Sequence, residues 1–145
     1  MENTLYAGFY SVDITPPLGQ DIPGYYHSRY ADGIADPLYL RATALACGDE
    51  KAVIFNCECV GIRAAAFDMI KKRVAAACDI SEDSIIINCV HSHTSFRIYA
   101  AEVGQGEISE LNIFLLRLYQ QFADCARLAF EDLKPCTMLG ATGEL

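Results

Sequence analysis

The chain has 145 residues, of which 52% are hydrophobic and 21% are charged, and its formal net charge is −8. This length and composition predict about one globular domain with a buried core, and they exclude a disordered chain. Because Lys71–Arg73 is the one basic cluster in an acidic sequence, we expect neither nucleic acid nor an anionic membrane as a partner.

Seven cysteines are spread along the chain without a CxxC pair, and their odd number does not suit a closed disulfide framework. We expect them to be small buried side chains in a reducing compartment. A zinc site through Cys57-x-Cys59 is disfavoured because a second cysteine pair is missing. The first residues show no secretory signal, and no run of about 18 apolar residues occurs, so the sequence predicts a soluble cytoplasmic protein without a membrane span.

The first part of the chain is predicted to form strands around one long loop. Residues 6–14 favour a strand that Thr15–Pro17 ends. Residues 18–37 follow as a loop rich in Gly, Pro, Asp and Tyr, and long ordered loops in small domains are often functional. Residues 38–47 and 52–60 predict two strands joined by a connection of hairpin length.

Helices dominate the second part. A helix is predicted over residues 64–78, with an apolar stripe of Phe67, Ile70, Val74 and Ala77. The β-branched run from Ile85 predicts a strand that is buried on both faces. A long helix is predicted from Ser109, as its N-cap, to about Leu133. Its first half is apolar nearly all round, so we expect burial on more than one face.

The predicted element order is β, loop, β, β, α, β, α, β, with the last strand over residues 136–141. This order predicts a single α/β layered domain over residues 1–145, with a mixed sheet and helices packed on it. Both helical connections are expected to join parallel strands by right-handed crossovers.

Two histidines, His91 and His93, directly follow the strand that begins at Ile85. If the strand persists that far, both side chains point to one side, with their Cα atoms about 6.5–7 Å apart. Two imidazoles at that separation can converge on one metal ion or one substrate, at the strand end where open α/β sheets bind ligands. We favour this ligand or catalytic role, and a purely structural role for two hydrogen-bonded histidines is the alternative.

A catalytic zinc site normally has three protein ligands and an open position, so the histidine pair requires a third ligand. The candidates lie at strand ends or in the long loop: Asp13, His27, Asp36 and Glu58. Glu58 is equally suited to orienting an imidazole or accepting a proton, or to being a half-exposed carboxylate. His27 belongs to the cluster Tyr25–Tyr30, which could gate a pocket, although packing of the loop on a surface is the favoured reading. Gly104–Glu107 indicates an anion site only weakly, because the glycine fingerprint of nucleotide-binding proteins is missing.

Several motifs along the chain, taken in order, resemble the N-terminal part of the neutral/alkaline, non-lysosomal ceramidase family. They include an Asp-Ile-Thr-Pro-Pro signature, a Gly-Tyr loop, a Gly-Ile-x-Asp-Pro-Leu-Tyr block, a His-x-His pair and a Leu-Lys-Pro segment. Their positions are 13–17, 23–25, 33–42, 88–94 and 133–135. The resemblance therefore covers nearly the whole chain.

The ceramidase family hydrolyses the amide bond of ceramide with a zinc-bound water. By resemblance, His91 falls on a zinc-ligand histidine, and His93 falls on the second histidine of the active site, which contacts substrate. Ser95–Ile98 replaces the family's glycine-rich turn, and the other zinc ligands of the family lie beyond the matching region. The resemblance thus implies an incomplete segment of a metal-dependent amidohydrolase, with zinc as cofactor and a small amide or lipid-like substrate.

The alternative is a non-catalytic α/β module of the same ancestry that acts in assembly or binds a small ligand. The missing ligands and the many-sided apolar helix from Ser109 favour it. Such a chain is expected to form a homo-oligomer or to lack a C-terminal region.

Overall fold

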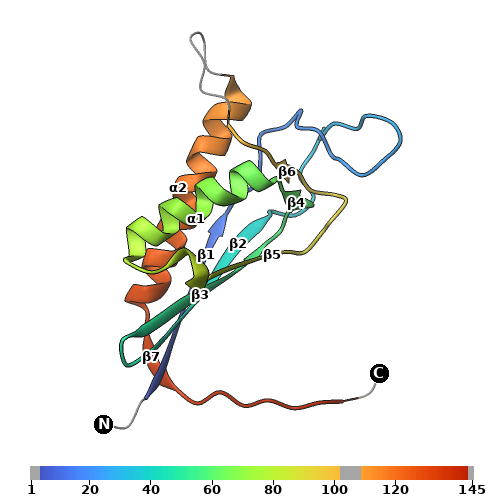
Figure 1. Cartoon of the computed structure of the whole chain (residues 1–145). Helices are drawn as coiled ribbons and strands as arrows, with labels where there is room; N and C mark the ends of the chain where they lie inside the picture. Colours follow the sequence, from blue (N-terminus) through green and yellow to red (C-terminus); the bar gives the residue numbers. More distant parts are fainter. Residues whose placement is uncertain (1–3, 102–108, 144–145) are drawn as a thin grey trace.

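The structure is a computed structural model that describes residues 4–101 and 109–143. A five-stranded mixed sheet in the order β5-β3-β2-β1-β7 carries two helices on one face, α1 (Ala64–Cys78) and α2 (Glu110–Glu131) (Figure 1). The strands are β1 (Leu5–Asp13), β2 (Tyr39–Cys47), β3 (Glu50–Cys57), β5 (Ile85–Cys89) and β7 (Lys134–Cys136). A pair of two-residue parallel strands lies apart from this sheet, namely β4 (Gly61–Ile62) and β6 (Arg97–Ile98), and a 3-10 turn over Glu82–Ser84 leads into β5. The expected α/β class is confirmed.

The strand directions agree with the expected parallel crossover through α1 and contradict the one expected through α2. β1, β2 and β3 form an antiparallel meander, and β5 runs parallel to β3. The connection through α1 is therefore the expected parallel crossover. β7 pairs antiparallel with β1 and so runs opposite to β5, which makes the expected parallel crossover through α2 wrong. The reason is that α2 packs across β1 and β2, which brings the chain back at the far edge of the sheet.

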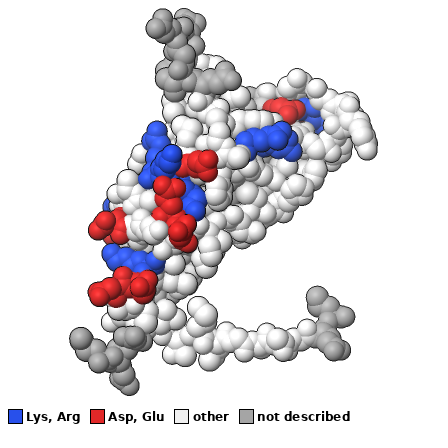
Figure 2. Space-filling view, in the orientation of Figure 1, with Lys and Arg blue, Asp and Glu red and all other residues white. Residues whose placement is uncertain are grey.

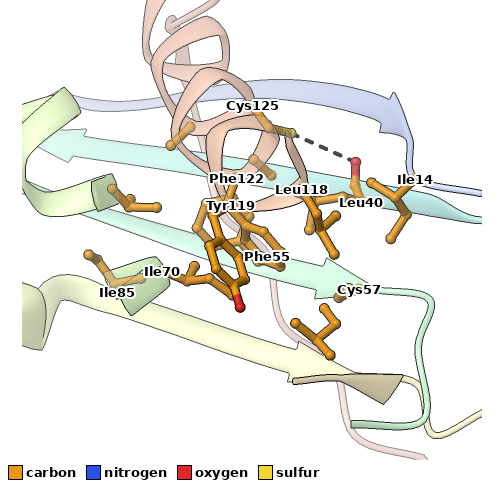
Figure 3. Close-up of a cluster of buried hydrophobic side chains, with 14 of the residues drawn as sticks. Ile14, Leu40, Phe55, Cys57, Ile70, Ile85, Leu118, Tyr119, Phe122 and Cys125 are labelled. Atoms are coloured by element: carbon orange, nitrogen blue, oxygen red, sulfur yellow. Dashed lines mark hydrogen bonds between the residues drawn. The ribbon is translucent and has the colours of Figure 1, made fainter. Parts of the chain in front are cut away.

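The hydrophobic core lies between the helices and the sheet face that they cover (Figure 3). Alternation along the strands places Leu40 of β2 and Phe55 of β3 on this face, where both are buried. The rings of Phe55 and Phe122 meet edge to face with centroids 5.2 Å apart, an arrangement that adds to their burial. The Cys125 thiol donates to the Leu40 carbonyl oxygen at 3.7 Å, so α2 also contacts the sheet through a polar atom.

Helix α2 approaches β1 most closely at Gly8. A Cβ atom at this position would lie 2.1 Å from the Ala129 carbonyl oxygen, well inside van der Waals contact. Only a residue without a side chain fits there, and the close approach lets the helix backbone lie directly on the strand.

Three expectations about burial are corrected. β5 is an edge strand whose Ile86 is exposed, so it is not buried on both faces, because the helices cover only one. Ile113 in the first half of α2 is exposed, because α2 packs with a single face. In α1 the buried residues are Ala66, Ile70 and Val74, whereas Phe67 is half-buried and Ala77 is exposed.

The predicted last strand over 136–141 is shorter and earlier in the structure, because only Lys134–Cys136 reach the edge of β1. The anion-site motif Gly104–Glu107 lies outside the described residues. Among the helices described, none has the length and apolarity needed to cross a bilayer.

Candidate functional site

The histidine pair lies on the segment that follows β5, and this segment is bonded to the one that follows β3. The backbone N–H groups of Val90 and His91 donate to the carbonyl oxygens of Cys57 and Cys59, both at 3.1 Å. Val60 N–H in turn donates to the Phe96 carbonyl oxygen at 2.9 Å. These bonds hold the irregular backbone around the histidines in place.

His91 adopts the left-handed backbone conformation, with φ at 59°. Its Nδ1 atom lies 2.7 Å from the Val60 carbonyl oxygen. A carbonyl oxygen can only accept, so Nδ1 carries the proton, and in the neutral ring Nε2 is left with a free lone pair. A backbone carbonyl that fixes the second nitrogen is the usual support of a metal-binding histidine.

His93 lies against His91 although the strand does not persist to either residue. The centroids of the two imidazole rings are 5.0 Å apart, and the rings are nearly perpendicular, at 81°. β5 ends at Cys89, so the rings converge through the turn rather than through strand alternation. The structure therefore brings the predicted pair together by a different route from the one expected.

The long loop over residues 15–38 is ordered by its own hydrogen bonds. Ile14 N–H donates to the Leu38 carbonyl oxygen at 2.8 Å, so the loop begins and ends at one place. Further along, Ile22 N–H donates to the Arg29 carbonyl oxygen at 2.9 Å, which makes the loop a hairpin-like excursion with residues 23–28 at its tip. A loop of this kind can hold side chains in fixed positions.

The tip of this loop contacts His93. Gly24, at a φ of +108°, approaches the imidazole so closely that a Cβ atom would lie 1.8 Å from its Nδ1 atom. The Tyr25 ring meets the His93 ring edge on, with centroids 6.2 Å apart, and His27 lies 6.0 Å from Tyr25 by the same measure. The Arg29 guanidinium stacks 4.1 Å above the Tyr25 ring. His27 thus lies in an exposed aromatic cluster, in which Tyr25 and not His27 contacts the histidine pair.

The other candidate ligands have partners of their own. The Glu58 carboxylate accepts from the Tyr39 N–H at 2.7 Å and pairs with the Arg41 guanidinium. Asp13 accepts from the Thr15 N–H at 2.8 Å, and hydrogen bonds from Thr15 hold the pKa of this carboxyl below its usual value. Across residues 4–101 and 109–143, no three His, Cys, Asp or Glu side chains are placed to hold one metal ion.

Three cysteines lie beside the histidine turn: the Cys57-x-Cys59 pair that is visible in the sequence, and Cys89, which no sequence pattern connects with that pair. Cys57 and Cys89 are register partners on the parallel strands β3 and β5, and Cys59 forms side-chain hydrogen bonds with both. The bond with Cys57 raises the pKa of Cys59, and the bond with Cys59, followed by burial, raises the pKa of Cys89. Both shifts favour the protonated thiols of Cys59 and Cys89, and Cys57 and Cys59 are buried packing groups of the core.

A pocket of roughly 250 Å³ lies beside the histidine pair. The long loop lines it with Asp21 and Asp36 among others, and Thr94, Ser95 and Phe96 line the opposite side. The last three directly follow His93, although neither histidine is part of the lining. The sequence carried a signal for Asp36 as a candidate site residue, but none for the buried Ser95.

One solved structure with a related fold is the neutral ceramidase from Pseudomonas aeruginosa. The TM-score is 0.70 at 18% sequence identity, and the match covers 93% of this chain. It covers 23% of the ceramidase chain, so this chain spans about a quarter of that protein's length. No protein-family model matches the sequence, and no curated protein does. The similarity is one of fold, and it agrees with the resemblance found in the sequence motifs.

Proposed function

We propose that this chain is the histidine-bearing part of a ceramidase-like, metal-dependent amidohydrolase. His91 supplies one metal ligand through Nε2, and His93 contacts the substrate. The observation that carries the proposal is the hydrogen bond between His91 Nδ1 and the Val60 carbonyl oxygen, because it leaves Nε2 free as a ligand. The fold similarity to the Pseudomonas aeruginosa neutral ceramidase supports it.

The described residues fit one part of a zinc site. Two imidazoles 5.0 Å apart by ring centroid suit zinc, but a catalytic site normally has a third protein ligand. When bound, zinc supplies a Lewis acid that activates water and polarises an amide carbonyl. The chain's own contribution is to hold His91 in one tautomer and to fix His93 between Gly24, Tyr25 and the His91 ring.

The substrate class proposed is a small amide or lipid-like amide. The aromatic cluster of Tyr25 and His27 beside the pair, and the mostly apolar pocket next to Thr94, offer surfaces for an apolar portion of such a molecule. His93, at the edge of this cluster, would form hydrogen bonds with oxygen or nitrogen atoms of the substrate.

The test is the zinc content of the purified chain by mass spectrometry after loading and dialysis. We expect near-stoichiometric zinc in the native sequence, with the site completed within the chain or across an oligomer, and its loss in His91→Ala. Tyr26→Ala is the matched control, because it removes a fully exposed side chain at the tip of the long loop that is not a candidate ligand. Circular dichroism of each variant separates loss of the ligand from loss of the fold. Absence of zinc from the folded native chain would contradict the metal role, and hydrolysis of a fluorogenic amide should be assayed only if zinc is held.

A non-catalytic α/β module for assembly or small-ligand binding is the second candidate. It is favoured by the lack of a third ligand beside the pair within the residues described. One result would favour this second candidate over the hydrolase. The folded native chain would retain no metal and would bind a ligand or a partner chain without turnover.

A further inference from the structure

The sheet face opposite the helices carries apolar side chains in solvent. Phe9 of β1 is 62% exposed, Ile54 of β3 is 37% exposed and Ile86 of β5 is 56% exposed. Alternation places these side chains on the side away from Gly8 and Phe55, which face the helices. We call this side the helix-free face. A sheet of a layered domain normally buries both faces or keeps the outer one polar, and this face does neither.

The middle of the helix-free face is also nearly uncharged, in a chain whose net charge is −8. Ala7, Thr43, Leu45 and Ala52 surround the three exposed apolar residues by register, and none of them is charged. Arg41 is on the same side but is neutralised by its ion pair with Glu58. Figure 2 shows the charged side chains in view gathered largely over the helices. Two copies of an acidic chain can approach each other through a neutral face without strong repulsion.

An apolar groove and an apolar segment lie next to each other at one edge of this face. The groove has a volume of roughly 460 Å³, and its lining is mostly apolar, with Phe9 and Leu45 of the sheet and Met138 beyond β7. Asp132 and Lys134 also line it, and they neutralise each other in an ion pair. Beyond β7, Thr137 and Met138 still line this groove, and residues 139–143 extend away from the body of the domain without entering a strand (Figure 1). Leu139 in this segment is 90% exposed. The chain therefore presents both a groove and an extended apolar segment of the kind that fills one.

We propose that the helix-free face binds a second copy of this chain in a two-fold dimer, in which residues 139–143 of each copy lie on the other copy's face. A two-fold interface uses the same patch on both copies, so it requires a surface that carries both the groove and the segment. The strands β1, β2, β3 and β5 have nine, nine, eight and five residues, and at a spacing of about 4.8 Å they present roughly 500 Å² per copy. Two such faces bury roughly 1,000 Å², the size at which specific interfaces begin, and the exchanged segments add to it.

The experiment is sedimentation velocity of the 145-residue chain over a range of micromolar concentrations. We expect a concentration-dependent dimer in the native sequence. Ile54→Lys and Leu139→Asp should each weaken dimerisation at least about tenfold, because each places a charge in the apolar contact. Ile113→Lys is the matched control, since Ile113 is an exposed isoleucine on α2, away from this face.

A monomer throughout the range would overturn the proposal and would point to another polypeptide as the cover of this face. It would also be overturned if Ile113→Lys abolished the dimer while Ile54→Lys left it intact. Leu139→Asp lies outside the folded sheet, so it keeps the test decisive if Ile54→Lys fails to fold. Zinc content of the dimer-breaking variants separates this proposal from the metal role of His91.

Discussion

His91 occupies a left-handed backbone conformation that costs a non-glycine residue about 1 kcal/mol or more. Two hydrogen bonds of His91 offset this cost. Its backbone N–H donates to the Cys59 carbonyl oxygen, and its side-chain Nδ1 donates to the Val60 carbonyl oxygen. Residues in such conformations cluster at functional sites, where the surroundings hold them in place. The conformation of His91 is thus set by the segment that follows β3 as much as by the strand that precedes it.

Gly24→Ala tests whether the long loop positions His93. The added Cβ atom would collide with the imidazole, and the φ of +108° disfavours any side chain, so we expect a loss of about 1–2 kcal/mol in the free energy of unfolding. The His93 ring should move, and its Cε1–H resonance should shift in the NMR spectrum. Gly33→Ala is the control in the same loop, because nothing lies within 4 Å of a Cβ atom there. An unchanged His93 resonance in Gly24→Ala would show that the loop does not hold the ring.

Among individual residues, the histidine pair could be identified from the sequence, but the residues that hold it in place could not. A β-branched run that ends in His-x-His is visible in the sequence, so His91 and His93 could be predicted. Val60 and Gly24 could not, because they lie about 30 and 70 residues away in the chain and reach the pair only through the register of β3 and the folding of the loop.

Gly8→Ala addresses the contact between α2 and β1. Because a Cβ atom would overlap the Ala129 carbonyl oxygen, the helix must shift outward, and we expect a loss of about 2 kcal/mol in stability. Urea unfolding followed by circular dichroism gives the value. Gly140→Ala, where nothing lies within 4 Å, should unfold like the native chain. Equal midpoints for the two variants would mean that α2 is not seated on β1 as described.

Tyr119→Phe tests the hydrogen bonds by which α2 fixes the backbone at Tyr99 and Ala101. The Tyr119 hydroxyl donates to the Tyr99 carbonyl oxygen and accepts from the Ala101 N–H at 2.9 Å. Its removal leaves two backbone groups unpaired, which should cost about 1–3 kcal/mol in urea unfolding. Tyr26→Phe is the control, because Tyr26 is fully exposed and should change stability little. A neutral Tyr119→Phe would indicate that water replaces the hydroxyl.

Elements with strong local signals were predicted closely, and those defined by pairing were not. The bounds of α1 agree with the apolar period, and Ser109 caps α2 by accepting from the Asn112 N–H, as its sequence indicated. The direction of β7 could not be predicted, because it depends on which sheet edge the chain reaches after α2. The two-residue strands β4 and β6 are too short to carry a period.

For the molecule as a whole, the rate at which cysteines react with a labelling reagent reports whether solvent reaches the core. Cys136 is exposed, whereas Cys57, Cys59 and Cys125 are buried, and burial raises the pKa of Cys125 to about 12. With an aromatic disulfide reagent at about pH 8, we expect Cys136 to react at once and the three buried thiols to react only on unfolding. Rapid reaction of Cys125 in the native protein would contradict the packing of α2 described above.

The position of β1 between β2 and β7 has a consequence for synthesis on the ribosome. Phe9 N–H bonds to Asp132, and Gln121 bonds to the Asp13 carbonyl oxygen, contacts that span 123 and 108 residues of chain. The meander of β1, β2 and β3 emerges first, but α2 covers its inner face only when most of the chain has been made. Until α2 has been made, the nascent chain therefore exposes the apolar inner face of this sheet, a state in which holding chaperones are most useful and premature aggregation is the main hazard.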